Sequence, residues 1–230
     1  MKRELLFELR SIAYLAIRDL KIELRKKHEI FSILTFSLVS ILVFSFSIDP
    51  FSKYTNEVIP ALIWFIILFS GIFGFSTTFT RERDQETIDA LRILPISPQA
   101  ALIGKTLYGF FLISIIEIVI IPVSLVFFNF SFKTNLFFVF IVFILGTIGL
   151  SLIGSMVSGL AMYSESRTIV IPMIMVPLIL PIIIPCILLT RTMVLINMTN
   201  LATPEFKIIL FTLIALFSAS IILFEYVLVD

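Results

Sequence analysis

The sequence has little of what most enzymes use for chemistry. Its 230 residues include one cysteine, Cys186, and one histidine, His28. A single cysteine excludes an intrachain disulfide and a CxxC site, and a single histidine excludes a multi-histidine metal site or a bis-histidine haem held by this chain alone. Only 14% of the residues are charged and the formal net charge is +1, so the overall charge does not indicate a nucleic-acid-binding protein. We expect no catalytic site, no resident cofactor or metal, and no nucleic-acid partner.

Long apolar runs are what the sequence has in abundance, because 59% of its residues are hydrophobic. A membrane-spanning helix needs about 20 consecutive apolar residues, whereas an outer-membrane barrel would show alternating segments of about ten. The runs here are continuous, which predicts an all-α membrane protein formed by one permease-like domain over residues 1–230, with no soluble catalytic domain. The six expected spans are 30–48, 58–80, 107–128, 135–162, 168–189 and 206–229.

The distribution of basic residues predicts the orientation of these spans. We expect the first span to be retained as an anchor, because no cleavage pattern of a secretory signal accompanies it. If the N-terminus is cytoplasmic, four of the 17 Lys and Arg residues fall outside, namely Lys53, Lys133, Arg191 and Lys207. The other 13 then lie inside, as the positive-inside rule requires. Both termini of this multi-pass protein are therefore expected in the cytoplasm.

The first 29 residues are neither a span nor an ordinary loop. Apolar residues recur there every three or four positions, while the charged residues lie mostly off that stripe, which predicts an amphipathic helix on the cytoplasmic membrane surface. The alternative is a basic tail that only orients the first span. The predicted stripe consists of Leu5, Leu9, Ala13, Ala16, Leu20 and Leu24.

Residues 81–106 form the most polar segment between two spans. The first half can form a short helix with an apolar edge and a charged edge, which Pro95 and Pro98 would end; the alternative is a solvated loop. Gly104-Lys105-Thr106 does not complete a phosphate-binding loop, since the required earlier glycine is Gln99 and no strand precedes it. Any ATPase must be a separate chain. The short helix would carry Arg83, Glu86, Ile88, Asp89, Leu91 and Arg92.

Polar and helix-breaking residues also occur inside the expected spans. Glu117 lies near the middle of the third span, where an ionised carboxylate costs at least roughly 2.5 kcal/mol. It must be protonated, paired or in a polar interior, either at a transport pathway or in a hydrogen bond between helices. Small residues repeat every four positions in the fourth span, which favours close packing in a bundle or a dimer. The fifth span is expected to kink or break at Pro172, Pro177, Pro181 and Pro185.

Several of these motifs together resemble a known family. The run R-E-R-D-x-x-T-I-D-x-L-x-x-L-P-x-S, followed by L-I-G-K, resembles the ABC-2 class of export permeases and above all the CcmB family. Glu86 stands where that family usually has glycine. Four further features are similar to that family. They are the glutamate and proline of the third span, the L-G-T-x-G start of the fourth, the prolines of the fifth, and R-D-L at 18–20. The closest correspondences are Thr87, Asp89, Leu91, Pro95, Gly104, Lys105, Glu117 and Pro122.

The resemblance implies a permease subunit of the cytoplasmic (inner) membrane that acts in haem export, or in release of a haem chaperone, for c-type cytochrome maturation. Its partners would be a CcmA-like ATPase, a CcmC-like membrane subunit and a CcmE-like chaperone, in a dimer or pseudo-dimer, with haem as a cargo that a partner holds. It also implies short re-entrant helices within 182–205. The segment expected to dock on the ATPase comprises Arg83, Asp84, Glu86, Thr87, Asp89, Leu91, Arg92 and Pro95.

Two alternatives remain open from the residues alone. The first keeps the ABC-2 architecture and changes the cargo to a lipid, a drug or a polysaccharide precursor. The second is an ion-coupled transporter that uses Glu117 as a proton site, although no inverted repeat is visible. Co-purification of an ATPase would separate the second alternative from the others.

Overall fold

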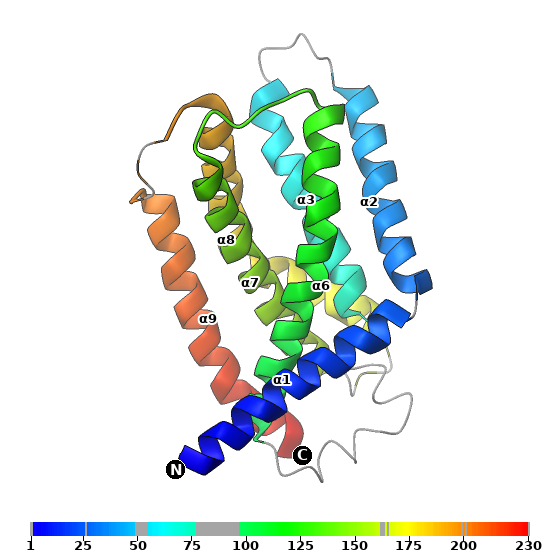
Figure 1. Cartoon of the computed structure of the whole chain (residues 1–230), viewed down its shortest axis with the longest axis vertical. Coiled ribbons are helices and arrows are strands. Elements are labelled where there is room, and N and C mark those ends of the chain that lie inside the picture. Colours follow the sequence, from blue (N-terminus) through cyan, green and yellow to red (C-terminus); the bar gives the residue numbers. More distant parts are fainter. Residues whose placement is uncertain are drawn as a thin grey trace.

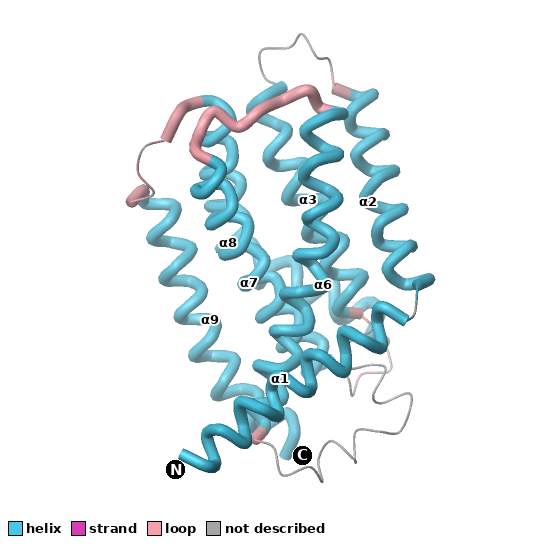
Figure 2. The backbone as a smooth tube through the Cα atoms, in the orientation of Figure 1, coloured by secondary structure: helices cyan, strands magenta, loops and turns pink. Residues whose placement is uncertain are grey.

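The computed structural model describes residues 2–25, 27–48, 55–76, 97–161, 164, 166–198, 200 and 202–229. These residues contain helices, turns and loops but no strand (Figure 2). The helices are α1 Lys2–Arg25, α2 Lys27–Ser47, α3 Thr55–Phe75, α6 Pro98–Phe127, α7 Leu136–Ala161, α8 Arg167–Leu195 and α9 Pro204–Val229.

Six of these helices are long and apolar enough to cross a membrane. They run from one end of the molecule to the other, whereas α1 crosses the end where α2 begins (Figure 1). The N- and C-termini lie at that same end, as an even number of crossings requires. The predicted all-helical, six-span architecture is confirmed.

The start of α6 differs from the prediction. We expected the third span to begin at residue 107, but α6 begins at Pro98. Proline suits the first helical position because its fixed φ is helical and no N–H is needed there. Ser97 caps the helix, since its hydroxyl accepts a hydrogen bond from the backbone N–H of Ala100 at 3.2 Å. Residues 98–106 therefore extend α6 beyond the predicted span.

Helix α7 lies at the centre of the bundle and packs against α3, α6, α8 and α9. Its small residues leave space for large side chains of these neighbours. A Cβ atom on Gly146 would overlap the Trp64 ring, and one on Gly154 would overlap the Phe75 ring. Gly159 similarly faces the Phe224 ring. These small residues therefore serve packing within one chain.

Helix α8 continues through all four of its prolines. The re-entrant helices expected within 182–205 are therefore wrong for residues 182–195, which belong to α8. A proline removes one backbone hydrogen bond, but side-chain packing holds the helix in register, because its buried face repeats every three or four residues against α3 and α7. That face consists of Ile171, Met175, Ile179, Ile182, Cys186, Leu189 and Met193.

The face of α1 that contacts the bundle also differs from the predicted stripe. Of that stripe, Ala16 is buried and Leu20 is half-buried, whereas Leu9, Ala13 and Leu24 are exposed. The residues that α1 buries in the bundle include two acidic side chains, which the hydrophobic pattern could not reveal. The fully buried residues on this face are Leu15, Ala16, Asp19 and Glu23.

Candidate functional site

The junction of α1 and α6 depends on a close approach at Gly104. A Cβ atom at this position would lie 3.1 Å from the Cβ of Leu15 and 3.3 Å from the carbonyl oxygen of Ile12. Both contacts are tighter than most Cβ atoms experience, so a larger residue at 104 would push α1 outward. The glycine therefore brings the two helices together at the end of the bundle where α1 lies.

A buried ion pair forms directly beside this close approach. The ammonium nitrogen of Lys105 lies 2.6 Å from Oδ2 of Asp19, and the two side chains are 2% and 9% exposed. Arg18 holds the other carboxylate oxygen, since its Nε donates a hydrogen bond to Oδ1 of Asp19 at 2.9 Å. Charges removed from water require close partners. The R-D-L and L-I-G-K motifs, distant in sequence, thus meet in one junction.

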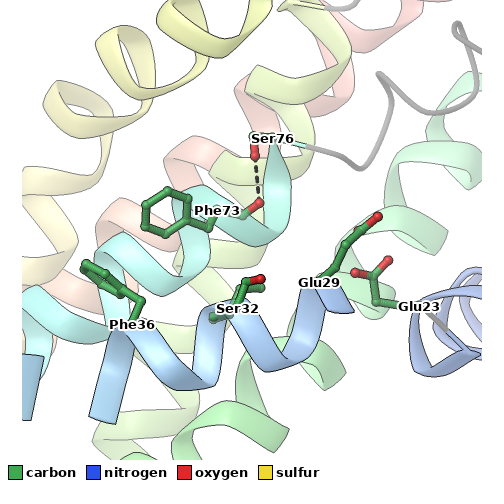
Figure 3. Close-up of a pocket in the computed structure, with 7 residues that line it drawn as sticks. Glu23, Glu29, Ser32, Phe36, Phe73 and Ser76 are labelled. Carbon is green, nitrogen blue, oxygen red and sulfur yellow. Dashed lines mark hydrogen bonds between the residues drawn. The ribbon is translucent and has the colours of Figure 1, made fainter. Parts of the chain in front are cut away.

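A pocket of about 380 Å³ lies between α1, α2 and α3. Figure 3 shows Glu23 of α1 and Glu29 of α2 beside each other at one side of the pocket. The rings of Phe36 and Phe73 meet edge to face at its other side, 5.2 Å apart. The pocket combines two carboxyl groups with aromatic surface at the end of α3, which leads into the predicted ATPase-docking segment. The sequence pattern does not reveal this pocket, because Glu23 and Glu29 resemble ordinary exposed charges.

The predicted ATPase-docking residues lie outside the part of the chain that the structure describes. Their docking role stays a prediction, whereas their flanks are defined: α3 ends at Phe75 and α6 begins at Pro98. The eight residues are Arg83, Asp84, Glu86, Thr87, Asp89, Leu91, Arg92 and Pro95.

Glu117 connects two helices inside the bundle. Its side chain is 6% exposed, and its Oε1 lies 2.6 Å from the hydroxyl oxygen of Thr147 on α7. The same hydroxyl lies 2.8 Å from the carbonyl oxygen of Phe143. A threonine has one hydroxyl proton, so both hydrogen bonds form fully only when Glu117 is a neutral acid and donates to Thr147. The arrangement therefore suits a hydrogen bond from an uncharged carboxyl group that holds α6 against α7.

A second polar contact joins helices near the centre of the bundle. The indole N–H of Trp64 on α3 donates to the hydroxyl of Thr190 on α8 at 3.0 Å, and that hydroxyl donates to the carbonyl oxygen of Cys186. The Trp64 ring stacks on Phe143 with centroids 5.0 Å apart. The roles of Thr147 and Thr190 were not predictable from the sequence, because one threonine in an apolar run carries no distinctive signal.

The prolines of the third and fifth predicted spans, which are hinge candidates, do not gather into a single site. Pro122 is exposed on α6, Pro177 and Pro181 are exposed on α8, Pro172 is half-buried and Pro185 is buried. Within the described ranges, no three His, Cys, Asp or Glu side chains are grouped as metal ligands would be. Polar side chains with partners on other helices include the Asp19–Lys105 pair, Glu117 with Thr147, and Trp64 with Thr190. Arg191 with Glu57 and Ser37 with Ser70 form further contacts of this kind.

Comparisons with known proteins match most of the chain. The sequence model of the CcmB protein family matches residues 10–227, a range that runs from α1 to α9 and includes both halves of the Asp19–Lys105 pair. The chain is also similar to heme exporter protein B of Haemophilus influenzae, with 24% identity over 166 residues. That alignment covers 72% of this chain and 74% of the relative.

Proposed function

Because the chain belongs to the CcmB family, we propose that it is the permease subunit of a haem-exporting ABC transporter that serves c-type cytochrome maturation. The family match over nearly the whole chain carries this conclusion. The name of the Haemophilus influenzae relative, heme exporter protein B, and the six membrane-length helices support it.

ATP hydrolysis is assigned to a separate cytoplasmic ATPase of the CcmA type. Residues 83–95 would dock on it, with the N-terminus, the C-terminus and α1 on the cytoplasmic side of the inner membrane. The uneven distribution of Lys and Arg supports this orientation. Because Gly104 and Lys105 hold α1 on the start of α6, movement of the segment before α6 would shift α1 and α6 together.

Haem would be held by partner subunits rather than by this chain. His28 is the only histidine and Trp64 the only tryptophan, so a bis-histidine site cannot form within one copy. CcmC-like and CcmE-like partners would supply the haem ligands, and a second copy of the chain would complete a dimeric permease. Glu117 would then hold α6 against α7 as the bundle moves.

The function is tested by deleting the gene in its host. Membrane proteins are stained for covalently attached haem, and b-type haem is measured by absorption spectroscopy as the internal control. Loss of c-type haem with b-type haem retained, and recovery on expression of the intact chain, is the expected result. Retention of both haem types in a host without another maturation system would contradict the proposal.

The ATPase-docking role is tested separately with Asp89→Lys, which reverses one charge in the proposed docking segment. Glu205→Lys in the first turn of α9 is the matched control, at the end of the bundle away from the start of α6 (Figure 1). We expect Asp89→Lys to abolish co-purification of the ATPase and c-type haem attachment, with the Glu205→Lys variant active. Normal ATPase association and haem attachment in Asp89→Lys would exclude the docking role.

A further inference from the structure

The outward face of α1 carries a shallow groove that the proposed transport function does not use. The groove has a volume of about 310 Å³, and its apolar members Tyr14 and Ile17 are 69% and 53% exposed. Its described lining residues all come from α1, so it lies on the side of this helix that turns away from α6. They are Tyr14, Ile17, Arg18, Lys21, Ile22 and Arg25.

The charged residues of this groove have one sign. Arg18, Lys21 and Arg25 follow each other at spacings of three and four residues, which places them in one row on a helix. No carboxylate is found among the described residues that line the groove. The nearby acidic residues of α1, Asp19 and Glu23, are buried, and Asp19 pairs with Arg18. Lys21 and Arg25, which are exposed, therefore present the positive charge of the row outward.

The position of α1 determines which molecules the row of basic side chains can contact. The helix crosses the end of the bundle where α2 begins (Figure 1), which is the depth of lipid headgroups if the six apolar helices cross the bilayer. Leu9, Ala13 and Leu24 are exposed on the side of α1 next to Ile17. An apolar side bordered by a basic row is typical of a helix that lies in the membrane interface.

We propose that the groove of Tyr14, Ile17, Arg18, Lys21, Ile22 and Arg25 binds the phosphate headgroup of an anionic phospholipid. Lys21 and Arg25 are exposed and supply the charge, whereas Arg18 also holds Asp19 and so links the headgroup to the α1–α6 junction. The ring of Tyr14 and the side chain of Ile17 pack against the glycerol and upper acyl region. An acidic protein surface is the competing occupant, but it would leave the adjacent apolar side of α1 uncovered.

The expected preference for anionic lipid follows from the number of exposed cations in the groove. Each Lys or Arg next to an anionic membrane surface favours binding by about five-fold at moderate ionic strength. Lys21 and Arg25 together should therefore give a preference for anionic over zwitterionic lipid of at most about 30-fold. Salt should weaken this preference, because exposed charges are screened.

The test uses the full-length chain in nanodiscs of phosphatidylcholine and phosphatidylglycerol. Tyr14→Trp places a fluorophore in the groove, and the parent chain with buried Trp64 alone gives the background emission. One of the two lipids at a time carries bromine on its acyl chain, and quenching is compared at equal mole fractions. Lys21→Gln with Arg25→Gln removes the proposed charges. Lys207→Gln, an exposed cation on α9, is the matched control.

We expect brominated phosphatidylglycerol to quench the introduced fluorophore more strongly than brominated phosphatidylcholine. The difference should disappear in the Lys21→Gln, Arg25→Gln chain and in about 0.5 M salt, and it should remain in the Lys207→Gln control. Equal quenching by both lipids in the Tyr14→Trp chain would overturn the proposal. Loss of the preference on addition of the purified ATPase would also overturn it, since a protein would then occupy the groove. Neither result depends on the identity of the cargo.

Discussion

Replacing Asp19 by Asn tests whether the buried ion pair holds α1 on the bundle. The Lys105 ammonium is 2% exposed and 2.6 Å from the Asp19 carboxylate, so water does not screen the pair. Loss of one partner of such a pair costs about 3–5 kcal/mol. At about 1.4 kcal/mol for each factor of ten, the population of detached α1 should rise by roughly 100-fold or more.

Hydrogen–deuterium exchange measures this detachment directly. Peptides from residues 2–25 should lose protection in Asp19→Asn, whereas peptides from α7 serve as the internal reference. Lys105→Met should have a smaller effect, because Arg18 stays 2.8 Å from Asp19. The double variant should be less damaging than the sum of the two single changes, since it leaves no unpaired charge from the Asp19–Lys105 contact.

A steric change at the same junction provides an independent check. Gly104→Ala adds a Cβ atom 3.1 Å from that of Leu15, and the matched change Gly71→Ala adds one at an ordinary 3.5 Å from Ile113. We expect reduced protection of α1 in Gly104→Ala only. Unchanged α1 exchange in both Asp19→Asn and Gly104→Ala would refute the assigned role of the junction.

Two further predictions concern contacts inside the bundle. Glu117→Gln should keep thermal stability in detergent close to that of the parent, because the amide can donate a hydrogen bond to Thr147. Glu117→Ala should lower the free energy of unfolding by about 1–3 kcal/mol. Equal losses in the two variants would show that the carboxyl charge matters instead. Gly146→Ala should displace the Trp64 ring, which occupies the space of the added Cβ atom, and shift the emission of this only tryptophan to longer wavelength. The Gly71→Ala control should leave the emission unchanged, and an unshifted Gly146→Ala spectrum would contradict the packing argument.

Much of the fold could be predicted because membrane insertion depends on local sequence. A run of about 20 apolar residues is sufficient to favour a spanning helix, and six such runs predicted the six membrane-length helices that the structure contains. The ends were less predictable. Ser97 and Pro98 start α6 well before residue 107, because an apolar run marks the membrane-length part of a helix and not its capped start.

The candidate site was predictable in its motifs but not in its pairings. The sequence identified R-D-L and L-I-G-K as separate features and left open whether Glu117 bonds to a helix or lines a pathway. It could not show that Asp19 meets Lys105, that Thr147 is the partner of Glu117, or that Glu23 faces a pocket with Glu29. Each contact joins residues of different helices, so the crossing of those helices decides it.

The sequence by itself therefore determined the class of protein, the number of spans and the family, because composition and motif order are properties of a linear chain. The tertiary structure decided which polar side chains meet. It also kept α8 continuous through Pro172, Pro177, Pro181 and Pro185, where local rules predicted a kink or a break. The physical reason is that a buried stripe from Ile171 to Met193 packs against α3 and α7, and this packing outweighs the hydrogen bonds that four prolines remove.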